Sequence, residues 1–179
     1  FIKSKKKVKV YNENDFTPEA YKTTIVAGLT TQLLHLESRI ASFLQQGFYT
    51  IGPCGEEILG AVGNNIQSND SVALHYRHLA TLIVRHLNEG KQIEDIILAR
   101  ARGYTVSVND PVTGGKHCAL GGSPNDFLVT STLASQSSPA VGRALGGQLA
   151  DVLGVPTPFG KDSISYVTVG DGSVNNAHF

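Results

Sequence analysis

The stretch Ser163–Ser173, SISYVTVGDGS, decides the fold that the sequence predicts, because an apolar run leads directly into a Gly-Asp-Gly loop. Its β-branched and aromatic residues are typical of a strand. A strand in a buried parallel sheet is not followed by a tight hairpin, since parallel neighbours need a long crossover. We therefore predict a parallel strand that ends in a ligand-binding loop, although an Asp-Gly pair taken alone is more often an ordinary turn.

A long helix is predicted near the other end of the chain. Thr17 has the side chain of an N-cap, and Pro18 suits the first helical position. The helix is expected to end near Gly47. Its apolar residues recur at alternating steps of three and four and predict one buried stripe that packs between layers or subunits. The stripe consists of Val26, Leu29, Leu33, Leu36, Ile40 and Phe43.

Between these two segments the patterns of helices and strands alternate. In chain order they predict a short helix at 55–66, a strand at 71–76, helices at 78–87 and 92–103, an irregular connection at 104–126, a strand at 127–133 and a helix at 138–153. Such alternation is typical of an α/β domain with a mainly parallel sheet flanked by helices. We place this domain at 17–179, after a basic N-terminal arm at 1–16.

Charge, hydropathy and cysteine content exclude several classes of partner. Fifteen Lys and Arg residues balance fifteen Asp and Glu residues, so no net field favours nucleic acid or an anionic lipid surface. No apolar stretch reaches the roughly 20 residues that span a membrane. Cys54 and Cys118 form neither a disulfide framework nor a zinc-finger spacing. We expect a soluble protein in a reducing compartment, the cytoplasm or, in a eukaryote, the mitochondrial matrix.

Three loops are candidates for chemistry, because ligands of parallel sheets sit beyond the carboxyl ends of the strands. These are His75–Arg77, Val129–Gln136 and Gly170–Ser173. In the last loop the glycines allow a phosphate to approach the backbone, and Asp171 offers a carboxylate to a divalent cation. The Arg77 guanidinium suits phosphate oxygens, although a surface arginine is the simpler interpretation.

Three histidines and two glutamates receive simpler interpretations. His117, in a glycine-rich loop, has the chemistry of a proton donor near neutral pH, although a lone loop histidine is more often only solvated. His75 and His78 have no carboxylate or cysteine at metal-ligand spacing, so we predict no metal site there. Glu56 and Glu57 suit the first turn of a helix, and that structural role suffices for them.

Five motifs, taken in order, resemble the α half of the thiamine-diphosphate-dependent 2-oxo-acid dehydrogenases. These enzymes are the decarboxylating first components of the pyruvate and branched-chain complexes. The resemblance runs from about Tyr21 to the end of the chain and depends on the order of the motifs. They are Gly55–Glu57, Tyr76-Arg77, Gly114–His117, Thr130–Gly142 and Gly170–Ser173.

The resemblance implies a thiamine-diphosphate-binding fold in which the cofactor is held through Mg²⁺ between an α and a β half. It implies that Asp171 ligates the metal and that Gly170, Gly172 and Ser173 lie near the diphosphate. The family also uses an asparagine further downstream, beyond the end of this chain, so we expect the fold to be C-terminally incomplete. The glutamate that activates the aminopyrimidine belongs to the β half, and we expect this part alone to be inactive.

The remaining implied contacts come from the other two loops. Tyr76 and Arg77 would hold the diphosphate oxygens, and Ser131 and Leu133 would line the cofactor. Branched-chain members add a K⁺-binding turn, which corresponds here to Thr130, Thr132, Ser135 and Gln136. After Tyr76-Arg77 the sequence departs from the usual family continuation, so His78 receives no family role.

The implied reaction is oxidative decarboxylation of a 2-oxo acid, with transfer of the acyl group to a lipoyl arm of the acyltransferase component. The stretch TSTLASQ, 130–136, favours a branched-chain substrate such as 2-oxoisovalerate over pyruvate. The implied assembly with the β half or β subunit is a dimer or heterotetramer. Two alternatives stay open: another thiamine diphosphate enzyme, such as a pyruvate, acetoin or transketolase-like enzyme, and a non-catalytic α/β binding module whose Gly-Asp-Gly is only a turn.

Overall fold

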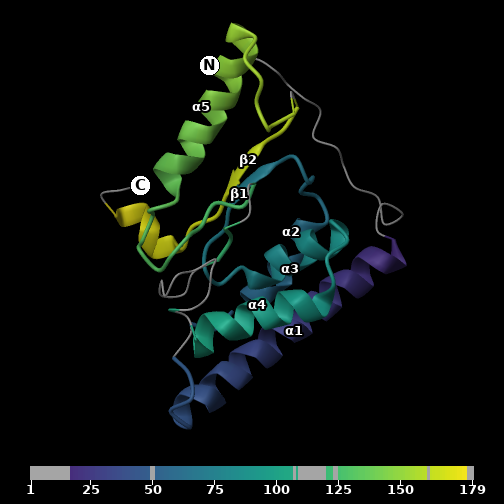
Figure 1. Ribbon diagram of the computed structural model, residues 1–179, viewed down its shortest axis with the longest axis vertical. Helices are drawn as coiled ribbons and strands as arrows, with labels where there is room; N and C mark the ends of the chain where they lie inside the picture. The colour runs from purple at the N-terminus through teal and green to yellow at the C-terminus, as the bar shows by residue number, and fades with distance from the viewer. Residues whose placement is uncertain are drawn as a thin grey trace.

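A mixed α/β arrangement, with five α-helices and a two-stranded parallel sheet, makes up the described part of the chain (Figure 1). This computed structural model describes residues 17–48, 51–106, 108, 120–122, 125–160 and 162–176. The predicted basic arm and His117 lie outside these ranges. The described elements are α1 (Pro18–Phe43), the 3₁₀ helix η2 (Glu56–Leu59), α2 (Gly60–Gly63), β1 (Ser71–Ala73), α3 (Leu79–Asn88), α4 (Ile93–Thr105), α5 (Ser137–Leu153), β2 (Ser165–Val167) and the 3₁₀ helix η4 (Asp171–Asn175). None of the helices described has the length and apolar content to cross a membrane.

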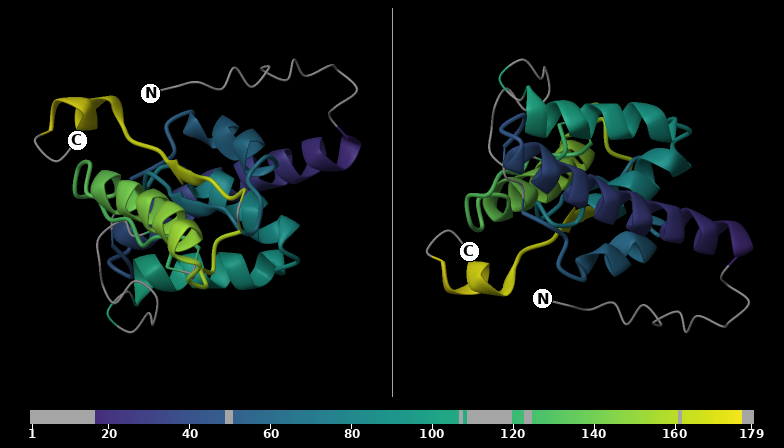
Figure 2. Two further views of the ribbon diagram at one scale, coloured as in Figure 1. Left: turned by 90° about the horizontal axis from the view of Figure 1, so that it is seen from above. Right: turned by 90° about the horizontal axis from the view of Figure 1, so that it is seen from below.

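The strand pair lies between two groups of helices. From above, α5 lies in front of the strands, and from below α1 does (Figure 2). Successive side chains of β1 enter different cores, because strand residues alternate between the faces of a sheet. Val72 packs with the residues of α1, α3 and α4, whereas Ala73 packs with Val129 and Ala140 on the side of α5. The predicted parallel strand with helices on both faces is therefore confirmed at this coarse level.

The strand predicted at 127–133 is wrong for the described structure. Asp126 forms a single parallel bridge with Val72, and Val129 forms a single antiparallel bridge with Leu120. Beyond Thr130 the backbone turns toward α5, and Ala134 takes a positive φ of 59°. The run at 127–133 therefore forms single bridges without extending into a strand, because its second half forms the connection to α5.

The N-terminus of α1 is as predicted, but its buried face is not. The Thr17 hydroxyl accepts the backbone N–H of Ala20 at 3.2 Å, and Pro18 starts the helix. The predicted apolar stripe is largely exposed, with Leu29 at 60% and Leu33 at 61%. The buried residues of the helix are Ala27, Thr31, Leu34 and Ser38.

Small residues explain this choice of face. Ala27, Thr31 and Ser38 let α1 approach its neighbouring helices closely, and a close fit maximises contact in a dense core. Apart from Leu34, the larger apolar residues of α1 are left on the outside. The helix also ends at Phe43, one turn before the glycine expected to stop it.

Two further boundaries differ from expectation. Helix α4 continues through Gly103 to Thr105, because a single glycine weakens a helix by only about 1 kcal/mol. Strand β2 is only partly buried, with Val167 39% exposed, because β1 is the only strand that it pairs with among the described residues.

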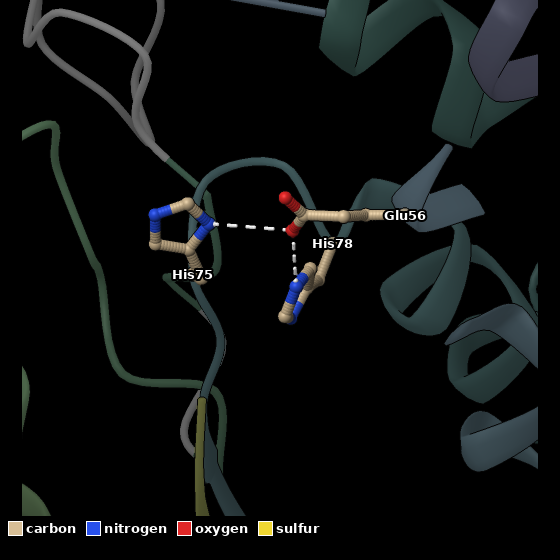
Figure 3. A group of neighbouring side chains, drawn as sticks. All are labelled: Glu56, His75 and His78. Atoms are coloured by element: carbon tan, nitrogen blue, oxygen red, sulfur yellow. Dashed lines mark hydrogen bonds and ion pairs between the residues drawn. The ribbon is translucent and has the colours of Figure 1, made fainter. Parts of the chain in front are cut away.

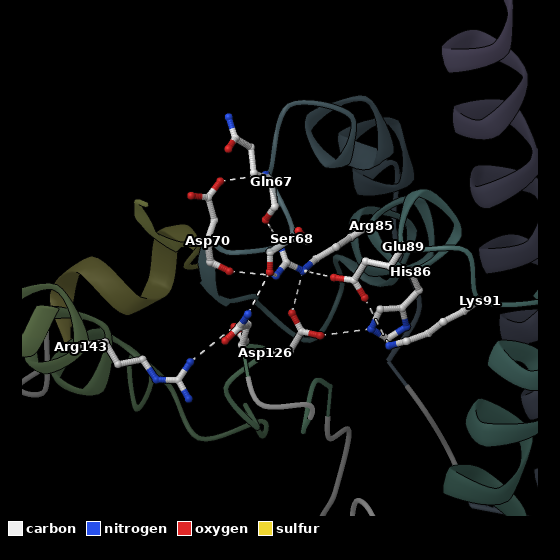
Figure 4. A network of polar contacts seen from close by, with 10 residues as sticks. Gln67, Ser68, Asp70, Arg85, His86, Glu89, Lys91, Asp126 and Arg143 are labelled. Atoms are coloured by element: carbon white, nitrogen blue, oxygen red, sulfur yellow. Dashed lines mark hydrogen bonds and ion pairs between the residues drawn. The ribbon is translucent and has the colours of Figure 1, made fainter. Parts of the chain in front are cut away.

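A buried ion pair joins α3 to the loop beside β1 (Figure 4). Nε of Arg85 lies 2.9 Å from Oδ1 of Asp126, and each side chain is 1% exposed. The same guanidinium donates to the carbonyl oxygens of Gln67, Ser68 and Asp70. Burial of a charge is tolerated here because the group is both paired and hydrogen-bonded.

Candidate functional site

Two of the three predicted ligand loops contact Thr168, the residue that follows β2, and the third begins two residues later at Gly170, which packs against His75. The Thr168 hydroxyl accepts the backbone N–H of His75 at 2.7 Å and lies 2.8 Å from Nδ1 of His78. The Thr168 carbonyl accepts a side-chain N–H of Gln136 at 2.7 Å. All three loops thus contribute residues to one edge of the sheet, the edge at which its parallel strands end.

Tyr76 and Arg77 lie close to this edge, beside His75. The Tyr76 ring is 4.0 Å from the His75 ring, and Cζ of Arg77 lies 5.2 Å from the centre of the Tyr76 ring. Nη1 of Arg77 lies 3.7 Å from Oε1 of Glu56, and its Nε is buried without a hydrogen-bond partner among the described residues. Arg77 lines a small cavity with side chains of α1 and α4, and Asp171 is not part of that lining.

The Gly-Asp-Gly loop begins η4 instead of closing a hairpin. Gly170 packs against His75 so closely that a Cβ there would lie 3.2 Å from Nε2 of the imidazole. Asp171 and Gly172 are exposed, and η4 lies at the periphery of the molecule (Figure 2). Ser173 is buried, and its hydroxyl has no hydrogen-bond partner among the described residues.

The predicted cofactor-lining residues lie in the turn that leads into α5. Ser131 is partly buried, and Leu133 is 43% exposed. Of the four residues assigned to a K⁺ turn, Gln136 donates to the Thr168 carbonyl, whereas the Thr130 hydroxyl donates to that of Thr132 at 3.3 Å. His117, the predicted proton donor, lies outside the described residues.

A compact cluster of Glu56, His75 and His78 lies beside the strand-end loops (Figure 3). Oε2 of Glu56 is 2.7 Å from Nε2 of His78 and 3.8 Å from Nδ1 of His75. Glu56 starts η2, His75 follows β1 and His78 caps α3, so three segments supply the cluster. The prediction that no carboxylate joins the two histidines is wrong, because the fold brings Glu56 to them from 22 residues away in the sequence.

Burial keeps both histidines neutral near neutral pH. The pKa of His75 falls from 6.5 to about 4 because its ring is buried and His78 lies beside it. Burial likewise lowers the pKa of His78, and the hydrogen bond to Glu56 opposes that decrease. A neutral imidazole presents one nitrogen lone pair, the form in which histidine binds a metal ion.

Sequence reasoning missed two residues of this region. Glu56 was assigned only to a helix start, a role that its neighbour Glu57 does fulfil by accepting the backbone N–H of Gly55 at 3.0 Å. Thr168 lies in the strand that the sequence predicts and has no predicted site role, although its hydroxyl bonds to both His75 and His78. Gly55 is the signal in the sequence for a sharp turn before Glu56, and the structure shows that turn as a positive φ of 96° where η2 begins.

No family model, curated protein or solved structure matches the chain.

Proposed function

We propose that this chain is the α half of a thiamine-diphosphate-dependent 2-oxo-acid dehydrogenase, with a branched-chain acid such as 2-oxoisovalerate as substrate. The observation that carries the proposal is the convergence of the three predicted ligand loops at the carboxyl ends of β1 and β2. These loops carry three of the five motifs on which the resemblance to the family depends. The three loops are far apart in the sequence, and the proposal requires them to lie at one edge of the sheet.

The residues at this edge suit a diphosphate and Mg²⁺. Asp171 offers an exposed carboxylate, and oxygen is the ligand that Mg²⁺ prefers. Ser173 and Arg77 carry buried donor atoms without partners among the described residues. Among the described residues other than its chain neighbours, none has a heavy atom within 4 Å of where a Cβ of Gly172 would stand, so this part of the backbone has room for a phosphate. The proposal requires the Arg77 guanidinium to turn from the cavity beside α1 toward this loop.

When bound, thiamine diphosphate supplies the carbanion chemistry of the decarboxylation. In the proposal this chain holds and orients the cofactor: Asp171 ligates Mg²⁺, Tyr76 and Arg77 bind diphosphate oxygens, and Ser131 and Leu133 line its body. The β half supplies the glutamate that activates the cofactor, and a lipoyl-bearing acyltransferase accepts the acyl group. The proposed assembly is a dimer or heterotetramer in the cytoplasm or the mitochondrial matrix.

Calorimetry with thiamine diphosphate tests the proposal directly. We expect the chain, combined with a β half, to bind thiamine diphosphate only in the presence of Mg²⁺, and to bind thiamine itself far more weakly. Arg77→Ala should weaken binding by about 1.5–3 kcal/mol, the typical contribution of a hydrogen bond to a charged group. The control is Arg39→Ala, which removes a guanidinium from the exposed face of α1.

The outcome separates the alternatives. Binding that is absent with and without Mg²⁺ would leave a non-catalytic α/β module, and an unchanged affinity in Arg77→Ala would remove Arg77 from the site. Turnover of pyruvate, acetoin or a sugar phosphate in place of 2-oxoisovalerate would assign a different thiamine diphosphate enzyme.

A further inference from the structure

We propose that Glu56, His75 and His78 form a binding site for a divalent transition-metal ion, with Zn²⁺ as the ion that their chemistry suits best. The site shares no ligand residue with the proposed Mg²⁺ site, and it depends only on residues whose positions are described. Two imidazoles and one carboxylate are a donor set that proteins use for Zn²⁺ with an open coordination position.

The spacing of the donor atoms fits one ion. The three ligand atoms lie within 4.8 Å of one another. Ligands at normal zinc bond lengths in a tetrahedron are about 3.4 Å apart. The observed separations of 2.7 Å and 3.8 Å from Oε2 of Glu56 lie on either side of that value. Small side-chain movements would therefore suffice to place an ion between the three residues.

The His75 imidazole supplies an independent observation. Its Nδ1 is buried, points toward the Glu56 carboxylate, and has no hydrogen-bond partner among the described residues (Figure 3). The ring as a whole is 3% exposed. A buried polar atom without a partner costs about 1–3 kcal/mol. The hydrogen bond between Glu56 and His78 gives each of these two side chains a partner. Nδ1 of His75 would gain a partner from an ion bound between the three residues.

A hydrogen bond behind the cluster orients the second imidazole. Nδ1 of His78 lies 2.8 Å from the Thr168 hydroxyl. With an ion bound, the proton of the neutral ring would lie on Nδ1 and be donated to Thr168, and Nε2 would present its lone pair to the ion instead of donating to Glu56. The same hydroxyl accepts the His75 backbone N–H, so Thr168 holds both ligand-bearing residues. Metal-binding histidines commonly have such a partner on their second nitrogen.

The ion would add a link between η2 and the stretch from β1 to α3, in which the His78 backbone N–H already donates to the His75 carbonyl. It would fasten the start of η2 to the loop after β1 and to the start of α3. Arg77, 3.7 Å from the other carboxylate oxygen, adds a positive charge beside the site and should weaken the affinity. We expect one ion per chain, an increased melting temperature on binding, and a Co²⁺ complex with the visible absorption of tetrahedral coordination.

The test is a Zn²⁺ titration of the full 179-residue chain after removal of metals with a chelator. It is done in a Cys54→Ser, Cys118→Ser background, so that no thiol binds the ion. Glu56→Gln and His78→Gln should each weaken Zn²⁺ binding about tenfold or more. Glu57→Gln is the matched control, because it removes the adjacent carboxylate of the same 3₁₀ helix and should leave the affinity unchanged.

Circular dichroism establishes that each variant is folded before the titration is interpreted. Glu56 is about one-third exposed, so its replacement by an isosteric amide should preserve the fold. Failure of the folded parent chain to bind Zn²⁺ more tightly than about 1 mM would overturn the proposal, as would equal affinities in Glu56→Gln and Glu57→Gln. Asp171→Asn should leave Zn²⁺ binding unchanged, so failure of the diphosphate site and failure of this site give different results.

Discussion

Glu56 and Glu57 are adjacent carboxylates with different surroundings. Glu57 accepts hydrogen bonds from Gln32 and from the backbone of Gly55, and it closes the turn before η2. Glu56 points to the two histidines and to Arg77. Neighbouring residues of a 3₁₀ turn point about 120° apart, so Glu56 faces the histidines and Glu57 does not.

His75 makes the stability of the folded chain depend on pH. In the unfolded chain its pKa is about 6.5, and in the folded chain burial and His78 lower it to about 4. Between these values the unfolded state binds more protons, so the free energy of unfolding should be highest above pH 6.5 and should decrease as the pH falls toward 4. The pKa difference corresponds to a loss on the order of 3 kcal/mol.

Urea unfolding at a series of pH values, in a chelator-containing buffer, measures this dependence. His75→Asn removes the titrating group and should give a shallower decrease over the same range. A decrease equally steep in that variant would show that other groups are responsible for the acid sensitivity.

At the scale of elements, the ion pair between Arg85 and Asp126 connects helix α3 to the loop that bridges to β1. Asp126 also lies 3.1 Å from Nε2 of His86, so two residues of one helix contact the same carboxylate (Figure 4). The side chains of Arg85 and Asp126 are both buried, so water solvates neither charge. The contact therefore fixes how the loop at 125–129 lies against the sheet.

Asp126→Ala should lower the free energy of unfolding by about 3 kcal/mol, because it leaves a buried guanidinium without its closest carboxylate. The loss should lie at the lower end of the usual range, since three backbone carbonyls still accept from Arg85. Chemical denaturation followed by circular dichroism measures it. Asp151→Ala, at an exposed position of α5, should change stability by less than about 0.5 kcal/mol, and equal losses would contradict the role of the pair.

At the scale of the whole molecule, large apolar side chains remain on two outer faces. They lie on α1 and on α5, helices on opposite sides of the strand pair (Figure 2). Exposed apolar surface of this extent marks an interaction surface more often than a free one. On α1 it includes Leu29, Leu33, Leu36, Ile40 and Phe43, and on α5 it includes Val141, Leu145, Leu149 and Val152.

We predict that the isolated chain self-associates through α1. Leu33→Glu places a charge in the centre of the exposed stripe and should weaken association about tenfold or more, as expected for a residue at an interface centre. Sedimentation velocity over a range of concentrations measures the change. Arg39→Gln changes the net charge by the same amount at another exposed position of α1, and it should leave association unaltered. A chain that is monomeric at all concentrations would contradict the prediction.

The sequence by itself determined most of the elements and the order in which they occur. Thr17 and Pro18 begin α1 as predicted, α3 and α5 lie where their patterns place them, and the strands before His75 and Gly170 are parallel. These features depend on caps, periodicity and turn residues, which act over a few neighbouring positions. The thiamine diphosphate function and the roles of Asp171 and Arg77 stay predictions.

Only the tertiary structure decided which side chains meet. Three features depend on contacts between residues far apart in the sequence. They are the buried face of α1, the approach of Glu56 to His75 and His78, and the pairing of Arg85 with Asp126. Both faces of α1 have helical periodicity, and the choice between them depends on how closely small residues let its neighbours pack. Periodicity shows that a helix has an apolar stripe, but the surface that covers a stripe is supplied by the rest of the fold.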